Sequence, residues 1–580
     1  MGLNKSNTGE TTPEGRKYER FHKLAVGAVL FIPAVVFSLI SSEGFRYPKM
    51  FSGEILVFLA VLVATLIWRG RGPVSSGVIL AGLIPVSALV SCTVSGHLLT
   101  AGNDLARLTA LWLFFLLLGR AGNPWHFLPV VIAGAAINIL IAWAQAVGWS
   151  PDWWVAWEGR HAIYGTFGNP NFLAEYAAPL AVLSLGFFLG SSRGVRRWGW
   201  LGIWTALISI LVLTVSRSAW LGLLVGLAVY FLASRGGNAG RRNSIIAGTA
   251  ALLVIALGWS QVYNRIASSF APGEPGISTR LHMWKVAGKI IAEHPVLGTG
   301  PGGYSLNYLE YSARIGEGGR QERPAYAGIT QDAHNDFLQA LAERGLTGGL
   351  VLLLLFVWIG WNGVAGLGEG QGRLGRSAAF GALAAILVES LFGFPLRVFP
   401  AACLFLWLIA CIVPFRPIGS IWRVTGSILA FVSALVGIWF TSRVMMADSM
   451  MHAGIVSPSG IKFMQKGLAL TPANGELHFR FALKLISAGK MDEAVVHLGQ
   501  AMPGFKDPDV QFNLGWIALQ EKKYRESIAW FVEGLRLYPY YRPSAWRDLA
   551  AAYRGAGMRA EAVEAEKRAV NPFAGENPEK

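Results

Sequence analysis

The chain has 580 residues, of which 53% are hydrophobic and only 14% are charged. Soluble globular domains carry about 25% charged residues, so this composition excludes an ordinary soluble enzyme as well as an intrinsically disordered chain. A net charge of +16 would suggest nucleic acid as the partner of a soluble protein. Here most arginines lie in short connectors between apolar runs, so we expect an integral membrane protein with no nucleic-acid partner.

Apolar runs recur along the chain, beginning after a basic tail at 1–20 that has no periodicity. A helix needs about 20 apolar residues to cross the ~30 Å hydrocarbon core of a bilayer, or fewer if flanking side chains reach the interface. Suitable runs lie near 24–40, 54–68, 76–95, 106–119, 126–148, 171–190, 199–215, 218–233, 245–259, 347–364, 377–395, 398–414 and 421–440. They predict an all-α, polytopic membrane domain over 21–440, with about 12–13 transmembrane helices and a polar loop at 260–345.

The connectors indicate the orientation. Cytoplasmic connectors are rich in Lys and Arg. If the N-terminus is cytoplasmic, every inner connector carries arginine: Arg69 and Arg71, Arg120, Arg193 with Arg196 and Arg197, Arg235 with Arg241 and Arg242, Arg373 and Arg376, and Arg416 with Arg423. The loops 150–170 and 260–345, the turn at 216–218 and all residues after 441 then face the periplasm of a multi-pass bacterial inner-membrane protein.

Residues 441–580 differ from the rest because they are amphipathic and mixed in charge, with a repeat of about 34 residues. The repeat aligns segments 481–494, 514–528 and 549–562, with a partial unit at 464–472. These segments resemble tetratricopeptide repeats, whose helix pairs stack into a solenoid with a concave surface. We expect a periplasmic repeat domain over 441–580 that binds a protein partner; the alternative is a rigid cap without a ligand.

Two arginines stand out on the expected outer face. Arg217 lies between two apolar runs on the expected outer face, so the enrichment of arginine in cytoplasmic connectors does not account for it. A guanidinium in such a place usually faces a cavity, an anion or a carboxylate. Arg280 and Trp284 are four residues apart and share one face of a predicted helix in the long outer loop. The alternative for Arg217 is a side chain that extends to the membrane surface from the end of a span.

A third polar segment, Gln331–Gly345, has the pattern of a helix with Asp332 as N-cap and Gly345 as its stop. His334 then falls in the first turn beside Asn335, among backbone N–H groups that attract anions. The alternative is a surface or packing histidine.

Two glycine- or asparagine-rich turns complete the outer face. The turn at 295–303 lacks the Gly-Lys-Ser/Thr ending of a nucleotide-binding loop, so a phosphate contact and a plain turn stay equally open. Asn169 and Asn171 flank Pro170 at the start of an apolar run. They are either a simple turn or a sugar or phosphate contact.

The cysteines and carboxylates indicate neither a metal nor a cofactor. Cys92, Cys403 and Cys411 lie in apolar runs without the spacing of a zinc site or a disulfide framework. The outer loops contain no Asp-x-Asp motif and no cluster of carboxylates. We therefore expect chemistry that relies on side chains.

These motifs occur in one order: the Gly165-x-Phe-Gly-Asn169 segment, Arg217, Arg280 with Trp284, and His334-Asn335. Together they resemble the O-antigen ligase and O-antigen polymerase superfamily of polytopic membrane glycosyltransferases, over roughly residues 20–440. The resemblance implies transfer of a glycan from undecaprenyl diphosphate to an acceptor in the periplasm. It does not separate the members of the superfamily, and the repeat region is an addition that not all of them carry.

Roles for the residues follow from that chemistry. Arginines bind phosphate through two parallel hydrogen bonds, so Arg217 and Arg280 are assigned to the pyrophosphate leaving group. A neutral imidazole suits proton abstraction near pH 7, so His334 is the candidate base or acceptor-orienting group. Substrate contacts are assigned to Asn169, Asn171, Trp284, Asp332 and Asn335. No second carboxylate is placed as a covalent nucleophile, which favours inversion at the anomeric carbon.

Several functions remain open at this point. Ligation of O-antigen to lipid A–core is the first expectation, polymerisation of repeat units the second, and O-glycosylation of a protein the third. A transporter or an assembly scaffold is the alternative of a different class. The polar residues favour an enzyme over a transporter, because transporters place their sites near mid-membrane and here they concentrate in outer loops.

Overall fold

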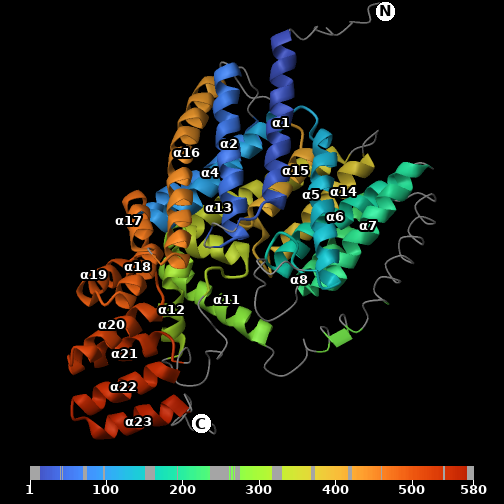
Figure 1. Cartoon of the computed structure of the whole chain (residues 1–580). Coiled ribbons are helices and arrows are strands. Elements are labelled where there is room, and N and C mark those ends of the chain that lie inside the picture. The colour runs from blue at the N-terminus through green and yellow to red at the C-terminus, as the bar shows by residue number, and fades with distance from the viewer. Residues whose placement is uncertain are drawn as a thin grey trace, which may run out of the picture.

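The computed structural model describes residues 13–38, 41, 43–68, 75–95, 98–149, 163–191, 194–234, 256, 260, 263–264, 267, 275–316, 330–367, 373–415, 421–458, 460–539 and 543–570. Within these ranges every extended regular element is a helix, which confirms the all-α fold (Figure 1). The predicted run at 245–259 lies almost entirely outside the described residues. The first helix begins at Pro13, inside the basic tail.

One bundle contains the apolar helices. Its members are α1 (Pro13–Val35), α2 (Arg46–Trp68), α3 (Ser76–Ser91), α4 (Leu98–Arg120), α5 (Leu128–Ala146), α6 (Pro170–Gly190), α7 (Val195–Thr214), α8 (Arg217–Ser234), α13 (Asp336–Gly366), α14 (Arg373–Glu389), α15 (Phe399–Ile412) and α16 (Ile421–Val456). Short 3-10 helices η1 (Cys92–Val94), η2 (Pro124–Phe127) and η3 (Pro395–Arg397) precede α4, α5 and α15. Nine helices of the described part are long and apolar enough to cross a membrane. The chain is therefore a multi-pass membrane protein.

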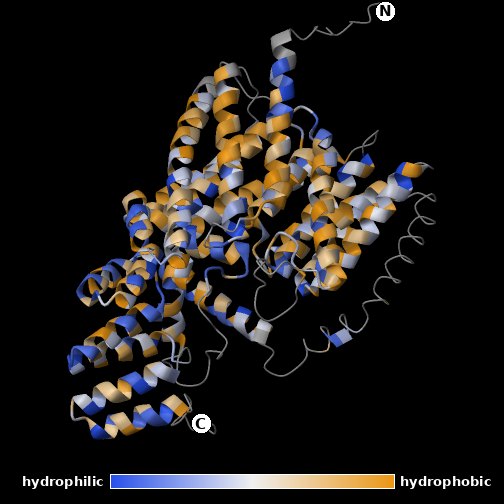
Figure 2. Ribbon diagram, viewed as in Figure 1, coloured by the Kyte–Doolittle hydropathy of each residue, from blue (hydrophilic) through white to orange (hydrophobic). Residues whose placement is uncertain are grey.

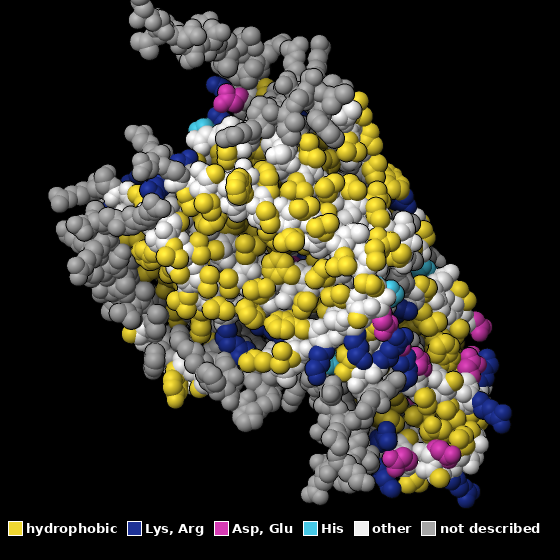
Figure 3. All heavy atoms as spheres, turned by 180° about the vertical axis from the view of Figure 1, so that it is seen from behind, with side chains coloured by type: hydrophobic (Ala, Val, Ile, Leu, Met, Phe, Trp, Pro, Cys, Tyr) yellow, Lys and Arg dark blue, Asp and Glu magenta, His cyan; other side chains and the backbone are white. Residues whose placement is uncertain are grey.

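The surface of the bundle is suited to lipid. On α13, Leu353, Val357 and Trp361 are 59%, 60% and 79% exposed, all on the side away from the other helices. Figure 3 shows hydrophobic side chains in a broad band across the bundle, whereas charged side chains gather on the helices at the C-terminal end. A contiguous apolar surface of this extent is typical of contact with hydrocarbon.

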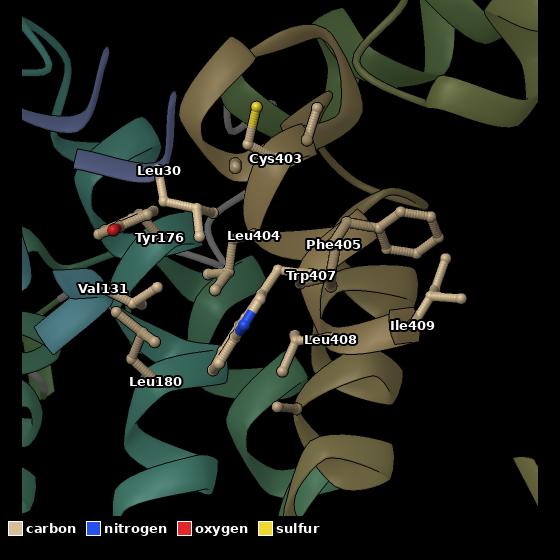
Figure 4. Packing of buried hydrophobic residues seen from close by; sticks show 14 of the residues in the cluster. Leu30, Val131, Tyr176, Leu180, Cys403, Leu404, Phe405, Trp407, Leu408 and Ile409 are labelled. Carbon is tan, nitrogen blue, oxygen red and sulfur yellow. The ribbon is translucent and has the colours of Figure 1, made fainter. Parts of the chain in front are cut away.

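The short helix α15 lies at the centre of the bundle. Its 14 residues span about 21 Å, less than the hydrocarbon core, and all of them except Leu406 are buried. The Trp407 indole N–H donates to Pro124 O at 2.9 Å, and its ring packs among Val131, Leu180 and Leu404 (Figure 4). Other helices enclose α15, so its ends need not reach the membrane surfaces.

Two amphipathic helices, α11 (Pro275–Glu293) and α12 (Gly303–Gly316), form a layer below the bundle, and α12 lies beside the C-terminal helices (Figure 1). They share a core with the start of α13, in which Tyr304 and Ile290 are completely buried. This layer lies within the predicted outer loop at 260–345.

The C-terminal helices form a solenoid of stacked pairs. They are α17 (Gly460–Leu470), α18 (Gly475–Ser487), α19 (Met491–Ala501), α20 (Pro508–Gln520), α21 (Tyr524–Leu537), α22 (Pro543–Gly555) and α23 (Arg559–Val570). Small residues let paired helices approach closely: a Cβ at Gly515 would lie 3.0 Å from the Phe531 ring, and one at Gly534 would lie 2.5 Å from Phe512. Figure 2 shows the alternation of polar and apolar positions that such stacking requires.

The solenoid is joined to the rest of the molecule in two ways. The helix α16 runs unbroken through the expected boundary at 440 and packs against α17 and α18. At the other contact, Arg536 of α21 lies 2.6 Å from Glu310 of α12. Leu537 packs on the core of the α11–α12 layer. The repeat region is therefore fixed to both the bundle and the layer beside His334.

Candidate active site

His334 lies just outside α13 rather than in its first turn. The N-cap is Asn335, whose Oδ1 accepts hydrogen bonds from Phe337 N at 3.0 Å and Leu338 N at 2.9 Å. The prediction that Asp332 caps this helix is therefore wrong. Asn and Asp cap almost equally well, so the pattern alone did not separate the two positions.

The backbone of His334 adopts the left-handed conformation, with φ at 50°. This region is uncommon for residues other than glycine and costs free energy. Neighbouring contacts maintain it: Ala333 N donates to Gln339 Oε1 at 2.9 Å, and Asn335 Nδ2 donates to Leu391 O at 3.0 Å. The backbone at His334 is thus held by hydrogen bonds of the residues on both sides of it.

The environment of the imidazole favours its neutral form. Its ring packs edge-on against Phe394, with centroids 4.9 Å apart. Burial, with a smaller contribution from Arg280, lowers the pKa of His334 to about 4, and Asp332 acts in the opposite direction. At neutral pH the ring therefore carries no charge and is able to accept a proton.

Arg280 and Trp284 approach His334 from α11, which packs on α13. Arg280 acts electrostatically on His334, so the two side chains lie within range of each other's charge. One turn further on, the Trp284 ring lies 6.1 Å from that of Phe392. The buried indole Nε1 of Trp284 has no hydrogen-bond partner among the described residues. The shared helix face predicted for Arg280 and Trp284 thus faces the His334 region.

Asp332 is an ionised carboxylate held by two arginines that the sequence analysis missed. Arg397 Nε lies 2.7 Å from its Oδ1, and Arg46 Nη1 lies 3.3 Å from its Oδ2. Burial on its own would raise the pKa of Asp332, but Arg46 and Arg397 hold it below its usual value. With both oxygens engaged, Asp332 orients the site around His334 and stabilises positive charge there.

Arg397 is the centre of this network. Its other nitrogens lie 3.1 Å from Asp104 and 3.2 Å from Glu343, and Arg107 adds a 2.9 Å contact to Asp104. Arg217 was singled out because it lies at the expected outer end of a helix, where the enrichment of arginine in cytoplasmic connectors does not explain it. The same reasoning applies to Arg397 in the Phe-Pro-Leu-Arg turn.

Arg217 is the first residue of α8, directly after a tight turn from α7. The turn contains Val215 at a φ of 53°, which is strained for a β-branched residue. Helix α8 packs on α14, where a Cβ at Gly222 would lie 2.9 Å from the Glu389 side chain. Ser390, which follows Glu389, lies beside the site, because its carbonyl oxygen accepts a hydrogen bond from Asp336 N at 2.9 Å. Arg217 is thus connected to His334 through two packed helices.

Asn169 and Asn171 lie at the start of α6. Asn169 is the N-cap, and its Oδ1 accepts from Asn171 N at 2.9 Å. Next in the chain, the Phe172 ring contacts Phe394 with centroids 5.2 Å apart. Since Phe394 also contacts His334, this turn borders the site, and the amide oxygen of Asn169 is already used for capping.

The glycine-rich turn at 295–303 has a structural role, because backbone N–H groups that could bind a phosphate instead donate to α13. Thr299 N and Gly300 N donate to the carbonyls of Ala342 and Glu343 at 3.0 Å and 2.9 Å. Those carbonyls have no hydrogen-bond partner within the helix because α13 breaks at Gly345, where φ is 58° and ψ is −158°. A Cβ at Gly345 would lie 2.3 Å from Val296 O. The turn therefore fixes the short helix that follows His334.

The donors around His334 do not form a metal site. Within the described ranges, no group of three His, Cys, Asp or Glu side chains is placed to hold a metal ion. The carboxylates of Asp104, Asp332 and Glu343 face arginines instead. The positive charge in this region is supplied by guanidinium groups.

Comparisons with known proteins address the two parts of the chain separately. Among solved structures, "Crystal structure of MamA protein" matches at 18% identity with a TM-score of 0.21, over 26% of this chain and 86% of that one. "MamA AMB-1 P212121" matches at 23% identity with a TM-score of 0.21, over 27% of this chain and 87% of that one. No curated protein matches the chain. Residues 201–353, which contain Arg217, Arg280 and His334, match the Wzy_C family, described as O-antigen ligase, and this confirms the family resemblance that the motifs indicated.

Proposed function

We propose that this chain is a glycosyltransferase of the bacterial inner membrane that transfers a glycan from undecaprenyl diphosphate to an acceptor on the periplasmic side. The observation that carries the proposal is the electrostatic influence of the cationic Arg280 on a partly buried, neutral His334. The two supply an anion-binding group and a base in one region of the molecule, within the residues matched to O-antigen ligases.

In the reaction, a hydroxyl oxygen of the acceptor attacks the anomeric carbon of the donor, and the bond from that carbon to the diphosphate oxygen breaks. The electron pair stays on the diphosphate. Arg217 and Arg280 stabilise the charge that develops there, and such charge stabilisation contributes about 3 kcal/mol per donor group. Direct displacement inverts the anomeric centre.

His334 takes the proton from the attacking hydroxyl. Its neutral state at pH 7 follows from burial and from Arg280. The carboxylate of Asp332 opposes the effect of Arg280 and stabilises the imidazolium that forms. Because Arg46 and Arg397 hold Asp332 from the far side, the carboxylate stays ionised throughout, and His334 is the group that moves the proton.

Ligation of O-antigen to lipid A–core is the acceptor reaction we favour, because the match is to an O-antigen ligase family. A specific observation supports protein O-glycosylation as a second candidate: the solenoid is fixed to the α11–α12 layer through Arg536 and Glu310. A polypeptide bound in the solenoid would lie on the same side of the molecule as His334.

The test is transfer by purified full-length protein from a lipid-diphosphate-linked glycan to lipid A–core or to polypeptide acceptors, with EDTA present. We expect His334→Ala and Arg280→Ala to lose about 100-fold or more in rate. The matched controls are His294→Ala and Lys289→Ala, exposed residues of the same layer, which should keep activity. Full activity in His334→Ala or strict dependence on a divalent metal would overturn the mechanism.

The glycan profile of a deletion strain separates the acceptors. Loss of a ligase leaves full-length polymer on the lipid carrier, loss of a polymerase leaves single repeat units, and loss of a protein glycosyltransferase leaves lipopolysaccharide unchanged. Removing residues 459–580 tests the solenoid, since a docking module is expected to affect the choice of acceptor more than the transfer itself.

A further inference from the structure

We propose that the bundle contains a separate binding site for an anionic amphiphile, a phosphate group attached to a hydrocarbon chain, in a cavity between α3, α4, α13 and α15. The proposed transfer reaction does not require this site. The cavity has a volume of about 130 Å³, close to the ~150 Å³ of a dry cavity that holds benzene. It therefore accommodates a short stretch of hydrocarbon chain.

The lining of the cavity changes from charged to apolar along the helix axes. Its charged end is formed by the N-terminal halves of α4 and α13 and by η3, where the arginines Arg107, Arg344 and Arg397 and the carboxylates of Asp104, Asp336 and Glu343 line it. Further along α4 the wall is apolar and includes Leu111 and Phe115. Eight residues separate Arg107 from Phe115, or about 12 Å along a helix. This gradient matches a molecule with one charged end and an apolar tail.

At the charged end, Arg344 forms no ion pair with any residue that the structure describes. Arg344 is only 8% exposed, and its buried Nη1 atom has no hydrogen-bond partner among the described residues. The adjacent carboxylate of Glu343 is occupied by Arg397 at 3.2 Å and Gln339 at 3.0 Å. A buried guanidinium without a partner is costly. An anionic head group bound at this end of the cavity would supply the missing partner.

The apolar part explains why the ligand is an amphiphile rather than a free anion. Inorganic phosphate would pair with Arg344 but leave the apolar walls without contacts. Ile84 of α3 and Leu352 of α13 line the cavity and are themselves partly exposed. Their neighbours Leu83 and Leu353 are exposed on the outer surface of the bundle. The wall formed by α3 and α13 is therefore the one that separates the cavity from the outer, lipid-facing surface of the bundle.

The cavity is connected to His334 but distinct from the place assigned to the diphosphate donor. Arg397 joins the two regions, because its Nε faces Asp332 beside His334 while its Nη atoms face Asp104 and Glu343 at the cavity. Arg280 reaches His334 from α11, which contributes no residue to the cavity lining. Binding in the cavity is thus measurable without any transfer.

Binding of farnesyl phosphate and of phosphatidic acid to the full-length protein in detergent, followed by native mass spectrometry, tests the proposal. Farnesol and diacylglycerol serve as the neutral counterparts. We expect both phosphorylated lipids, or one of them, to bind at least about tenfold more tightly than the neutral ones. The preference between the two identifies a prenyl or an acyl chain as the natural occupant.

Three variants assign the binding to this cavity. Arg344→Gln should lose about tenfold in affinity for the phosphorylated lipid while leaving neutral lipid unchanged. Ala340→Leu, which fills the cavity at a residue that lines it, should weaken both. His334→Ala should keep full binding although it loses transfer, which separates this proposal from the proposed function.

The control is Arg314→Gln, an arginine on α12 that is 47% exposed and should bind lipid as the unmodified protein does. Unfolding temperatures show whether each variant is folded. Equal affinity for phosphorylated and neutral lipids, or unchanged binding in Arg344→Gln, would overturn the proposal. If Ala340→Leu does not fold, the comparison of head groups and the Arg344→Gln result decide the matter.

Discussion

The guanidinium of Arg397 lies 2.7 Å from the carboxylate of Asp332, two residues before His334 in the chain. The 64 residues between them hold all of α13 and α14, so only the folded bundle brings the two groups together. Through this pair, the network around Arg397 fixes the segment that presents the imidazole. The same arginine faces the charged end of the cavity between α4 and α13.

Replacing Arg397 should be strongly destabilising. In Arg397→Met, the carboxylates of Asp104, Asp332 and Glu343 lose a shared cation in a buried site, and breaking such a network costs about 3–5 kcal/mol. Chemical denaturation of the purified protein measures the change. Arg568→Met on α23, where the arginine is 38% exposed beside Glu564, should change stability by no more than about 1 kcal/mol. Equal effects of the two substitutions would contradict the central role of Arg397.

The pH dependence of transfer should follow the ionisation of His334. A base must be unprotonated, and the pKa of His334 is lowered to about 4, so activity should be retained down to about pH 5 and fall as pH drops through 4. Arg280 lowers this pKa, so Arg280→Gln should move the acid limb upward, toward the ordinary value of about 6.5. Initial rates of the two proteins from pH 3 to 8 measure the acid limb of each. A wild-type limb near 6.5 would argue against a lowered pKa of His334.

The left-handed backbone at His334 gives a test of strain that is independent of chemistry. Because φ is 50°, His334→Gly should be more stable than His334→Ala by about 1 kcal/mol, the reverse of the usual order. At Lys289, in the interior of α11, the alanine variant should instead be more stable than the glycine variant by about 1 kcal/mol. The unfolding temperatures of the four variants test this prediction. If the glycine and alanine variants have the same order of stability at both positions, the backbone at His334 is not strained.

Gly345 should tolerate no side chain. Its φ of 58° and the approach of Val296 O to within 2.3 Å of an added Cβ predict that Gly345→Ala costs about 2 kcal/mol or more. It should also release the 295–303 turn from α13, which proteolysis would detect. The control is Gly288→Ala on α11, where an added Cβ meets nothing within 4 Å and should stabilise the helix by up to about 1 kcal/mol. An unaffected Gly345→Ala variant would contradict the described break in α13.

The sequence by itself was sufficient to predict that the described part of the chain is helical, with membrane-spanning helices followed by a repeat region. Apolar runs and the repeat of about 34 residues are local patterns, so they predicted the bundle and the solenoid without long-range information. The motifs around Arg217, Arg280 and His334 indicated a family that the match over 201–353 supports. Local pattern also predicted that Gly345 ends the first helix after His334, where the structure has its break.

Only the tertiary structure decided which charges meet. Asp332 looked like a helix cap because its neighbours in sequence fit that role, but Arg46 and Arg397, 286 and 65 residues away in the chain, take both of its oxygens. An arginine in an apolar protein can be paired, as Arg397 is, or can have no anion among the described residues, as is the case for Arg344. Which of the two occurs depends on distances across helices. Those distances are set by packing, and no spacing along the chain encodes them.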